Sequence, residues 1–388
     1  MKLKCNETYQ EGFKLMKLFD VYPLYEVSPT KAKDVYVYDE AGTEYLDLYG
    51  GHAVISIGHS HPHYVNRLQE QLQKIAFYSN AVENPLQKEL ADEIGEQSCL
   101  HEYQLFLCSS GAEANENALK LASFQNGKKR VVAFKNAFHG RTSAAVAATD
   151  NLNINAPLNQ QQEVTFIPFN NVQALEKELQ IGDVCAVIFE PIQGVGGLDQ
   201  PEEDFVLKME QLCYQYNTAL IADEVQSGFS RSGTFFAFQN NNIKPHVITM
   251  AKGMGNGFPI GGILVHPDIK PKYGMLGTTF GGNHLACTAS LAVLEILKKD
   301  KLQKNAKEME AYFRDRAEKI KGVKIKGRGL MLGLEFDFEV GPLRKSLIYE
   351  KHIFTGGSSN KKVLRILPPL TVQKVHFDQF FDALEDLL

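Results

Sequence analysis

Short apolar runs separated by segments with helical periodicity occupy the middle of the chain, from about residue 86 to residue 285. Continuous apolar runs are typical of strands that are buried on both faces, whereas a half-exposed strand alternates apolar and polar residues. The pattern therefore predicts an α/β domain with a mostly parallel sheet. The expected strands are Gln104–Cys108, Arg130–Phe134, Cys185–Phe189, Ala219–Ala222 and Val247–Ala251.

The two ends of the chain have a different pattern. Residues 34–49 alternate apolar and polar positions around a turn at 40–42, which predicts a small antiparallel hairpin. After residue 286 a charged amphipathic helical stretch extends to about Lys321, followed by a strand at 329–336 and a C-terminal helix. We expect an N-terminal segment (1–50) that belongs to the small domain, a large domain (51–285) and a C-terminal small α+β domain (286–388). Residues 356–362 have the composition of a flexible insert.

Composition excludes several classes of function. The 388 residues suit one large and one smaller domain, and the net charge of -5 is spread without blocks, which makes nucleic acid an unfavourable partner. The N-terminus has no hydrophobic signal region and no apolar stretch approaches the roughly 18 to 20 residues of a membrane span, so we expect a cytoplasmic protein that does not bind membranes. The cysteines lack metal-ligand spacing, so we expect reduced packing residues and no metal. They are Cys5, Cys99, Cys108, Cys185, Cys213 and Cys287.

Candidate chemistry lies where the expected strands end, the edge at which open α/β sheets bind ligands. Lys252 ends an apolar run and precedes the glycine-rich segment 253–262. Apolar surroundings lower the pKa of a lysine and free its amine as a nucleophile, although most lysines at strand ends are simply solvated. Ser110 and Glu113 have capping-box spacing, and free amides at Gly111 would suit a phosphate; an ordinary capped helix is the alternative.

Two further strand ends carry groups that suit a charged aromatic ring. Asp223 ends an apolar run and needs a positive partner, which a protonated ring nitrogen would supply. Gln226 could bond a phenolic oxygen of that ring or satisfy backbone. Phe138 could stack on the ring and Arg141 could bind a carboxylate, or the two could be a core residue and a surface ion pair. A phosphate site, a stacking face, a carboxylate and an amine form the set that pyridoxal phosphate (PLP) needs, with Lys252 as proton shuttle.

The order of motifs along the chain resembles that of the class III (ornithine-type) aminotransferases, and within them most closely the acylornithine aminotransferases of arginine biosynthesis. The resemblance implies the fold type I of PLP-dependent transferases, with a mostly parallel seven-stranded sheet between helices and a small α+β domain. It also implies a homodimer with shared active sites. The motifs are CSSGAEANENALKLA, FHGRT, EPIQG, DEVQSGFSRSG, AKGMGNGFPIGG, TTFGGN and RILPPL.

The resemblance also implies a role for each site residue. PLP would form a covalent imine with Lys252 and move the δ-amino group of an N-acylornithine to 2-oxoglutarate, giving the semialdehyde and glutamate. Arg141 would bind the donor's α-carboxylate and Arg365 a carboxylate of 2-oxoglutarate or glutamate, while Glu190 would support Gln226. The implied cofactor ligands are Ser110, Gly111 and Ala112 at the phosphate, Phe138 on the ring, Asp223 at its nitrogen, Gln226 at its hydroxyl, and Thr279 at the neighbouring subunit's phosphate, with Thr278 at the substrate.

The chain departs from the family pattern at several positions. Ala112 replaces a usual threonine, and His284 replaces a usual proline with no consequence that we derive. Val195 replaces a glutamate that can mask the C-terminal arginine, so we hypothesise that Arg365 stays available and that N-succinylornithine rivals N-acetylornithine as donor. His52 stands where an apolar or tyrosyl residue is usual; it could donate to an acyl oxygen or be a surface or dimer contact.

Other activities remain open at this point. Ornithine and 4-aminobutyrate aminotransferases are the close alternatives, and a glutamate-1-semialdehyde aminomutase is less favoured because Arg365 provides for a second dicarboxylate.

Overall fold

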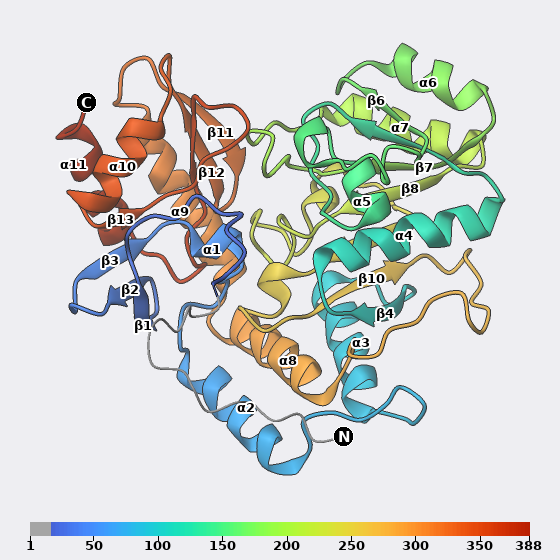
Figure 1. Ribbon diagram of the computed structural model, residues 1–388, viewed down its shortest axis with the longest axis horizontal. Helices are drawn as coiled ribbons and strands as arrows, with labels where there is room; N and C mark the ends of the chain where they lie inside the picture. Colours follow the sequence, from blue (N-terminus) through green and yellow to red (C-terminus); the bar gives the residue numbers. More distant parts are fainter. Residues whose placement is uncertain (1–16) are drawn as a thin grey trace, which may run out of the picture.

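The central sheet of the computed structural model, which describes residues 17–388, has seven strands in the order β4-β10-β9-β8-β7-β5-β6 (Figure 1). The pairs from β9 to β6 are parallel, whereas β10 is antiparallel to both β4 and β9. The predicted mostly parallel seven-stranded sheet is confirmed. Its strands are β4 (Gln104–Cys108), β5 (Arg130–Phe134), β6 (Val164–Ile167), β7 (Val184–Phe189), β8 (Ala219–Asp223), β9 (Val247–Met250) and β10 (Gly261–Val265).

Helices cover both faces of this sheet, and successive strand residues pack into different cores. In β7, Val187 and Phe189 lie in one hydrophobic cluster together with residues of α7, while Ala186 and Ile188 lie in another with residues of α4. Burial on both faces is the reason for the continuous apolar runs. The helices around the sheet are α3 (Pro85–Ser98), α4 (Gly111–Asn126), α5 (Ser143–Ala147), α6 (Val172–Gln180) and α7 (Glu203–Gln215), with 3-10 turns η1 (Leu152–Ile154), η2 (Ala237–Asn241) and η3 (Lys252–Met254).

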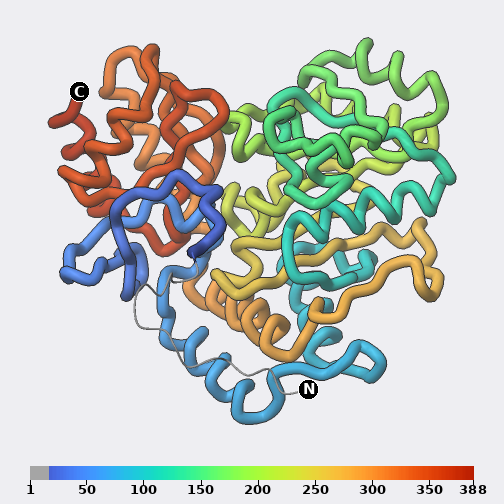
Figure 2. Tube along the Cα trace, in the orientation of Figure 1, coloured from blue at the N-terminus to red at the C-terminus, as the bar shows by residue number. Residues whose placement is uncertain are grey.

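Two smaller sheets lie outside the large domain, and one of them contains strands from both ends of the chain. The predicted hairpin is present as the antiparallel pair β2–β3, and β13 pairs in parallel with β3, so strands from both ends share one sheet. Figure 2 shows the blue N-terminal segment against the orange-red C-terminal part of the chain. The expected domain boundaries stay a prediction. The strands are β1 (Pro29–Lys33), β2 (Tyr36–Asp39), β3 (Glu44–Asp47) and β13 (Ile353–Phe354) in one sheet, and β11 (Lys324–Arg328), β12 (Met331–Glu335) and β14 (Val363–Ile366) in the other.

The helical stretch predicted after residue 286 is divided into two helices. Lys301 has a φ of 53° between them, and a left-handed residue cannot continue a right-handed helix. None of the helices within 17–388 is long and apolar enough to cross a membrane. The remaining helices are α1 (Gly50–Ala53), α2 (Pro62–Lys74), α8 (His284–Lys299), α9 (Leu302–Ala317), α10 (Gly341–Tyr349) and α11 (Lys374–Glu385).

Candidate active site

A cavity of about 390 Å³ lies at the carboxyl ends of β4, β5, β7, β8 and β9. These strands run in the same direction, so the loops that follow them meet at one edge of the sheet. The cavity brings together eight of the predicted site residues. They are Ser110, Gly111, Ala112, Phe138, Arg141, Asp223, Gln226 and Lys252.

Lys252 directly follows the loop residue after β9 and reaches this cavity from the start of η3. Its φ of 47° lies in the left-handed region, which costs a residue with a side chain roughly 1 to 2 kcal/mol and is common at functional sites. Burial lowers the pKa of its ammonium group, and the nearby carboxyls of Asp223 and Glu190 offset this only in part. The amine is therefore easier to deprotonate than that of an exposed lysine.

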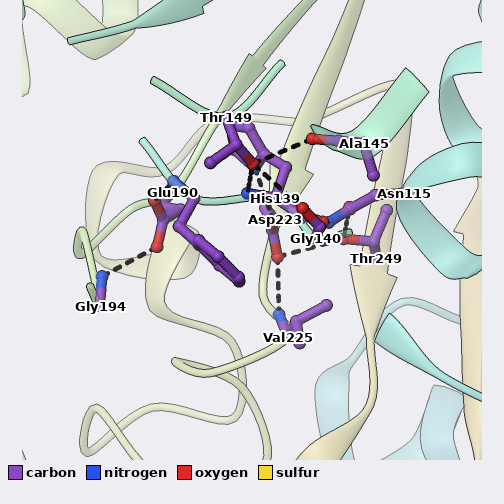
Figure 3. A network of polar contacts seen from close by, with 11 residues as sticks. Asn115, His139, Gly140, Ala145, Thr149, Glu190, Gly194, Asp223, Val225 and Thr249 are labelled. Atoms are coloured by element: carbon purple, nitrogen blue, oxygen red, sulfur yellow. Dashed lines mark hydrogen bonds and ion pairs between the residues drawn. The ribbon is translucent and has the colours of Figure 1, made fainter. Parts of the chain in front are cut away.

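Asp223, the last residue of β8, is 4% exposed and held by a buried network (Figure 3). Its Oδ2 accepts from Asn115 Nδ2 and from His139 Nδ1, both at 2.7 Å. Its Oδ1 accepts from the Val225 N–H at 3.1 Å. Sequence reasoning singled out neither Asn115 nor His139. The only available signal was the position of His139 beside Phe138, because its contact with Asp223 spans 84 residues.

Glu190, which follows β7, is a second buried carboxyl group beside the cavity. It accepts from the Phe138 N–H at 2.9 Å and from the Gly194 N–H at 2.8 Å (Figure 3). Burial raises the pKa of Glu190 to about 7. It fixes the backbone on both sides of the cavity and has no hydrogen bond with the Gln226 side chain within the described residues.

The start of α4 is a capped helix N-terminus that faces the cavity. Ser110 is the N-cap, and its Oγ accepts from the Glu113 N–H at 3.2 Å. Glu113 Oε2 accepts from the Ser109 N–H at 2.7 Å, one residue before the predicted reciprocal partner. Gly111 allows the start of α4 to lie close to Val225, since a Cβ at residue 111 would lie 2.6 Å from Val225 Cγ1. The first amides of the helix are left for a ligand such as a phosphate.

The Gln226 side chain has a free acceptor that suits the hydroxyl group of a ring bound in the cavity. Its Nε2 donates to the His52 carbonyl at 3.1 Å, while its Oε1 is buried and has no partner within residues 17–388. An unpaired buried acceptor costs roughly 1 to 3 kcal/mol, which a polar ligand recovers by bonding to it. The unpaired amide oxygen, Asp223, the α4 amides and the Lys252 amine match the polar groups of PLP.

Arg365 in β14 lies behind the cavity wall at 4% exposure. Its Nε donates to the Gly357 carbonyl at 2.5 Å and its NH1 to the Gly194 carbonyl at 2.8 Å. It forms no ion pair with a carboxylate of the described chain, and burial lowers the pKa of its guanidinium. Val195, which lines the cavity, supplies no carboxylate. The groups that hold Arg365 are therefore neutral carbonyls.

His52 belongs to α1, which is a single left-handed turn outside the cavity lining. Gly50, Gly51, His52 and Ala53 have φ values of 54°, 55°, 69° and 61°. The turn directs the His52 carbonyl to Gln226 and its ring Nδ1 to the Tyr49 hydroxyl at 2.5 Å.

Thr278 and Thr279 are not brought to the cavity that contains Lys252. Thr278 lines a separate hollow with Asn80 and Asn84, and Thr279 is exposed.

Comparison with known proteins gives one family over nearly the whole chain. Residues 21–388 match the family model "Aminotransferase class-III". The chain is 37% identical to the acetylornithine aminotransferase of Aquifex aeolicus over 384 residues, which is 96% of this chain and 99% of that protein. It is 35% identical to the acetylornithine aminotransferase of Bacillus subtilis over 380 residues, which is 96% and 97%.

Solved structures agree in fold. The ornithine aminotransferase of Toxoplasma gondii ME49 is similar with a TM-score of 0.87 at 28% identity, over 94% of this chain and 92% of that one. A second structure of the Toxoplasma gondii enzyme, similar with a TM-score of 0.86 at 28% identity over 94% and 90% of the two chains, reveals partial occupancy of PLP at its active site.

Proposed function

This chain belongs to the class III aminotransferases, and we propose that it transfers the terminal amino group of an N-acylornithine to 2-oxoglutarate. The products are the N-acylglutamate semialdehyde and glutamate, and the reaction serves arginine biosynthesis. The observation that carries the proposal is the single cavity shared by Lys252, Asp223, Phe138 and the start of α4. Curated relatives named acetylornithine aminotransferase cover more than nine-tenths of the chain and support the acylated donor.

The enzyme uses pyridoxal 5′-phosphate, whose protonated ring draws electrons away from the carbon that loses a proton. Lys252 is proposed to hold this cofactor covalently, and its Nζ then accepts a proton from the substrate carbon and returns it. The lowered pKa of Lys252 suits this work, since a proton carrier acts best when its pKa is near the working pH.

The other cavity residues bind and orient. Asp223 faces the ring nitrogen, Phe138 covers the ring, and the amides of Gly111 and Ala112, with Ser110, hold the phosphate. Gln226 meets the ring hydroxyl through its unpaired Oε1. Each assignment follows the chemistry of the group that faces the cavity.

Two arginines are proposed to bind the carboxylates of the substrates. Arg141 lines the cavity, is exposed and has no ion pair within the described residues, so it is free to bind the donor's α-carboxylate. Arg365 binds a carboxylate of 2-oxoglutarate or glutamate and exchanges the neutral Gly194 carbonyl for it. Because no carboxylate of residues 17–388 masks Arg365, a donor with an additional carboxylate, N-succinylornithine, stays a candidate beside N-acetylornithine. His52 and Thr278 are proposed to contact the donor, although within one chain both lie outside the lining of the cavity.

A second copy of the chain completes the site in this proposal. Thr279 is exposed and would reach the phosphate of the neighbouring subunit in a homodimer. Exposed aromatic side chains near it would be covered by that contact: Phe280 is 63% exposed and lies 5.6 Å, centroid to centroid, from Phe77, which is 42% exposed. We place the enzyme in the cytoplasm.

Ornithine aminotransferase is the alternative that the solved structures raise. The similarity to the Toxoplasma gondii enzyme is consistent with it but does not favour it over an acylated donor, because identity is higher to the acetylornithine enzymes. 4-Aminobutyrate as donor and an aminomutase reaction are less favoured. An aminomutase needs no added 2-oxoglutarate, so dependence on 2-oxoglutarate separates these reactions.

The proposal is tested by following glutamate formation from N-acetylornithine and 2-oxoglutarate with purified protein. We expect Lys252→Ala to abolish both turnover and the absorbance of the imine between the cofactor and Lys252, while Lys319→Ala, which changes an exposed lysine, keeps both. If Lys252→Ala retained turnover or that absorbance, the assigned role of Lys252 would be wrong.

A further inference from the structure

His139 is a buried histidine to which the proposed function gives no task. It follows β5, and its side chain has no exposed surface. Its Nδ1 lies 2.7 Å from Asp223 Oδ2, and its backbone N–H donates to Thr149 Oγ1 at 2.9 Å (Figure 3). The imidazole therefore reaches the carboxylate from the loop after β5, and both residues belong to the lining of the cavity.

The surroundings of the ring fix the direction of its hydrogen bond to Asp223. His139 Nε2 is buried and has no partner within residues 17–388. An ionised carboxylate can only accept, so the hydrogen between the two groups belongs to Nδ1. His139 therefore donates from Nδ1 to Asp223 Oδ2, and its Nε2 takes no part in this bond.

The donors around Asp223 are divided unequally between its two oxygens. Oδ2 receives both short bonds, from His139 and from Asn115, whose Nδ2 also donates to the His139 carbonyl at 2.7 Å. Oδ1 receives the Val225 N–H at 3.1 Å. Thr249 Oγ1 is 3.4 Å from Oδ1 but gives its hydrogen to Asn115 Oδ1 at 2.7 Å. Oδ1 is thus the oxygen with a free acceptor position.

We propose that His139 is a positioning residue that acts through Asp223: it saturates Oδ2 and leaves Oδ1 to accept from the cofactor's ring nitrogen. The inference rests on the proposed function, because it requires a protonated ring at Asp223. The other charged groups near this pair are Glu190, whose pKa is influenced by both His139 and Asp223, and Lys252, whose pKa is influenced by Asp223. Neither is hydrogen-bonded to His139 in the described chain, so the bond to Asp223 is the direct route for its effect.

The test compares two histidine variants in the full-length holoenzyme. His139→Leu removes the donor, whereas His139→Asn keeps an amide N–H near the position of Nδ1. Thr149→Val is the matched control, because it removes the acceptor for the His139 backbone N–H without touching the Asp223 carboxylate. Each protein is loaded once with pyridoxal 5′-phosphate and once with an analogue that has CH in place of the ring nitrogen. The measurement is the pH at which the absorbance of the bound cofactor changes.

We expect His139→Leu to shift this pH by about one unit with pyridoxal 5′-phosphate, since a hydrogen bond to a charged group is lost and one unit corresponds to the strength of such a bond. His139→Asn returns the midpoint most of the way to that of the unaltered protein, Thr149→Val lowers Tm without moving the midpoint, and the analogue shows no difference among the proteins. An unchanged midpoint in His139→Leu, or an equal shift with the analogue, overturns the inference and leaves a packing role. Failure of the unaltered protein to bind pyridoxal 5′-phosphate would instead overturn the proposed function.

Discussion

Gly194 has no side chain at a point where the groups of the cofactor site and the carboxylate site meet. Its N–H donates to Glu190 at 2.8 Å and its carbonyl accepts from Arg365 at 2.8 Å. In Gly194→Ala the new Cβ would lie 2.0 Å from Gln226 Oε1, a contact too short to exist. The obstructing atom is the end of a flexible side chain, so we expect Gln226 to rotate away while the backbone keeps its course.

The size of the effect follows from the bonds that Gln226 gives up. Rotation breaks its 3.1 Å bond to the His52 carbonyl and prevents its bond to the ring hydroxyl of the cofactor. A neutral hydrogen bond contributes about 0.5 to 1.5 kcal/mol, so the free energy of unfolding should fall by about 1 kcal/mol. The lost cofactor bond should weaken PLP binding about tenfold, since a factor of ten corresponds to about 1.4 kcal/mol.

Titration of the apoenzyme with PLP, followed by absorbance, measures the Kd, and urea unfolding measures stability. Gly341→Ala is the control, because nothing lies within 4 Å of a Cβ at that position. If the displacement of Gln226 is the cause, Gly194→Ala adds little to Gln226→Ala in the double variant, since both remove the same bond. An unchanged Kd in Gly194→Ala, or fully additive losses in the double variant, would refute the reasoning.

Two further changes test the charges of the molecule. Val195→Glu places a carboxylate beside the Arg365 site, where an ion pair with Arg365 would compete with 2-oxoglutarate. KM for 2-oxoglutarate should therefore rise about tenfold in Val195→Glu and change little in the control Val195→Leu. An unchanged KM in Val195→Glu would show that residue 195 cannot reach Arg365. Burial raises the pKa of Glu224 from its ordinary 4.5 to about 7, so the native state binds more protons between these values and its stability falls, by up to about 3 kcal/mol, as pH rises from about 4.5 to about 7. Glu224→Gln cannot ionise and should flatten this fall in urea unfolding measured across that range; a fall as steep as in the unaltered protein would contradict the assignment.

The sequence predicted the sheet well wherever a strand is buried and apolar, but it missed β6 and β10. β10 begins with Gly261 and Gly262, which belong to a glycine-rich run that is typical of a loop. Added Cβ atoms there would lie 2.5 Å from the Ser110 carbonyl oxygen and 2.8 Å from that of Phe106. Close packing of neighbouring backbones, and not turn formation, requires these glycines. A local pattern does not distinguish the two causes.

The residues that face the cavity were predictable, whereas the contacts behind them were not. Ser110, Phe138, Asp223 and Lys252 each stand at the end of a recognisable strand, and parallel strands bring such ends together. The bond from Arg365 to Gly194 joins positions 171 apart through a glycine carbonyl, a group that every residue has. No residue type marks such a contact in advance.

The comparison of amino donors with 2-oxoglutarate held constant tests the central claim most directly. The kcat/KM values for N-acetylornithine, N-succinylornithine, ornithine and 4-aminobutyrate should place an acylated ornithine first, with both free amines well below it. The ratio of the two acylated donors decides whether the open Arg365 site selects the additional carboxylate. A higher kcat/KM for ornithine or 4-aminobutyrate than for either acylated donor would contradict the proposed function.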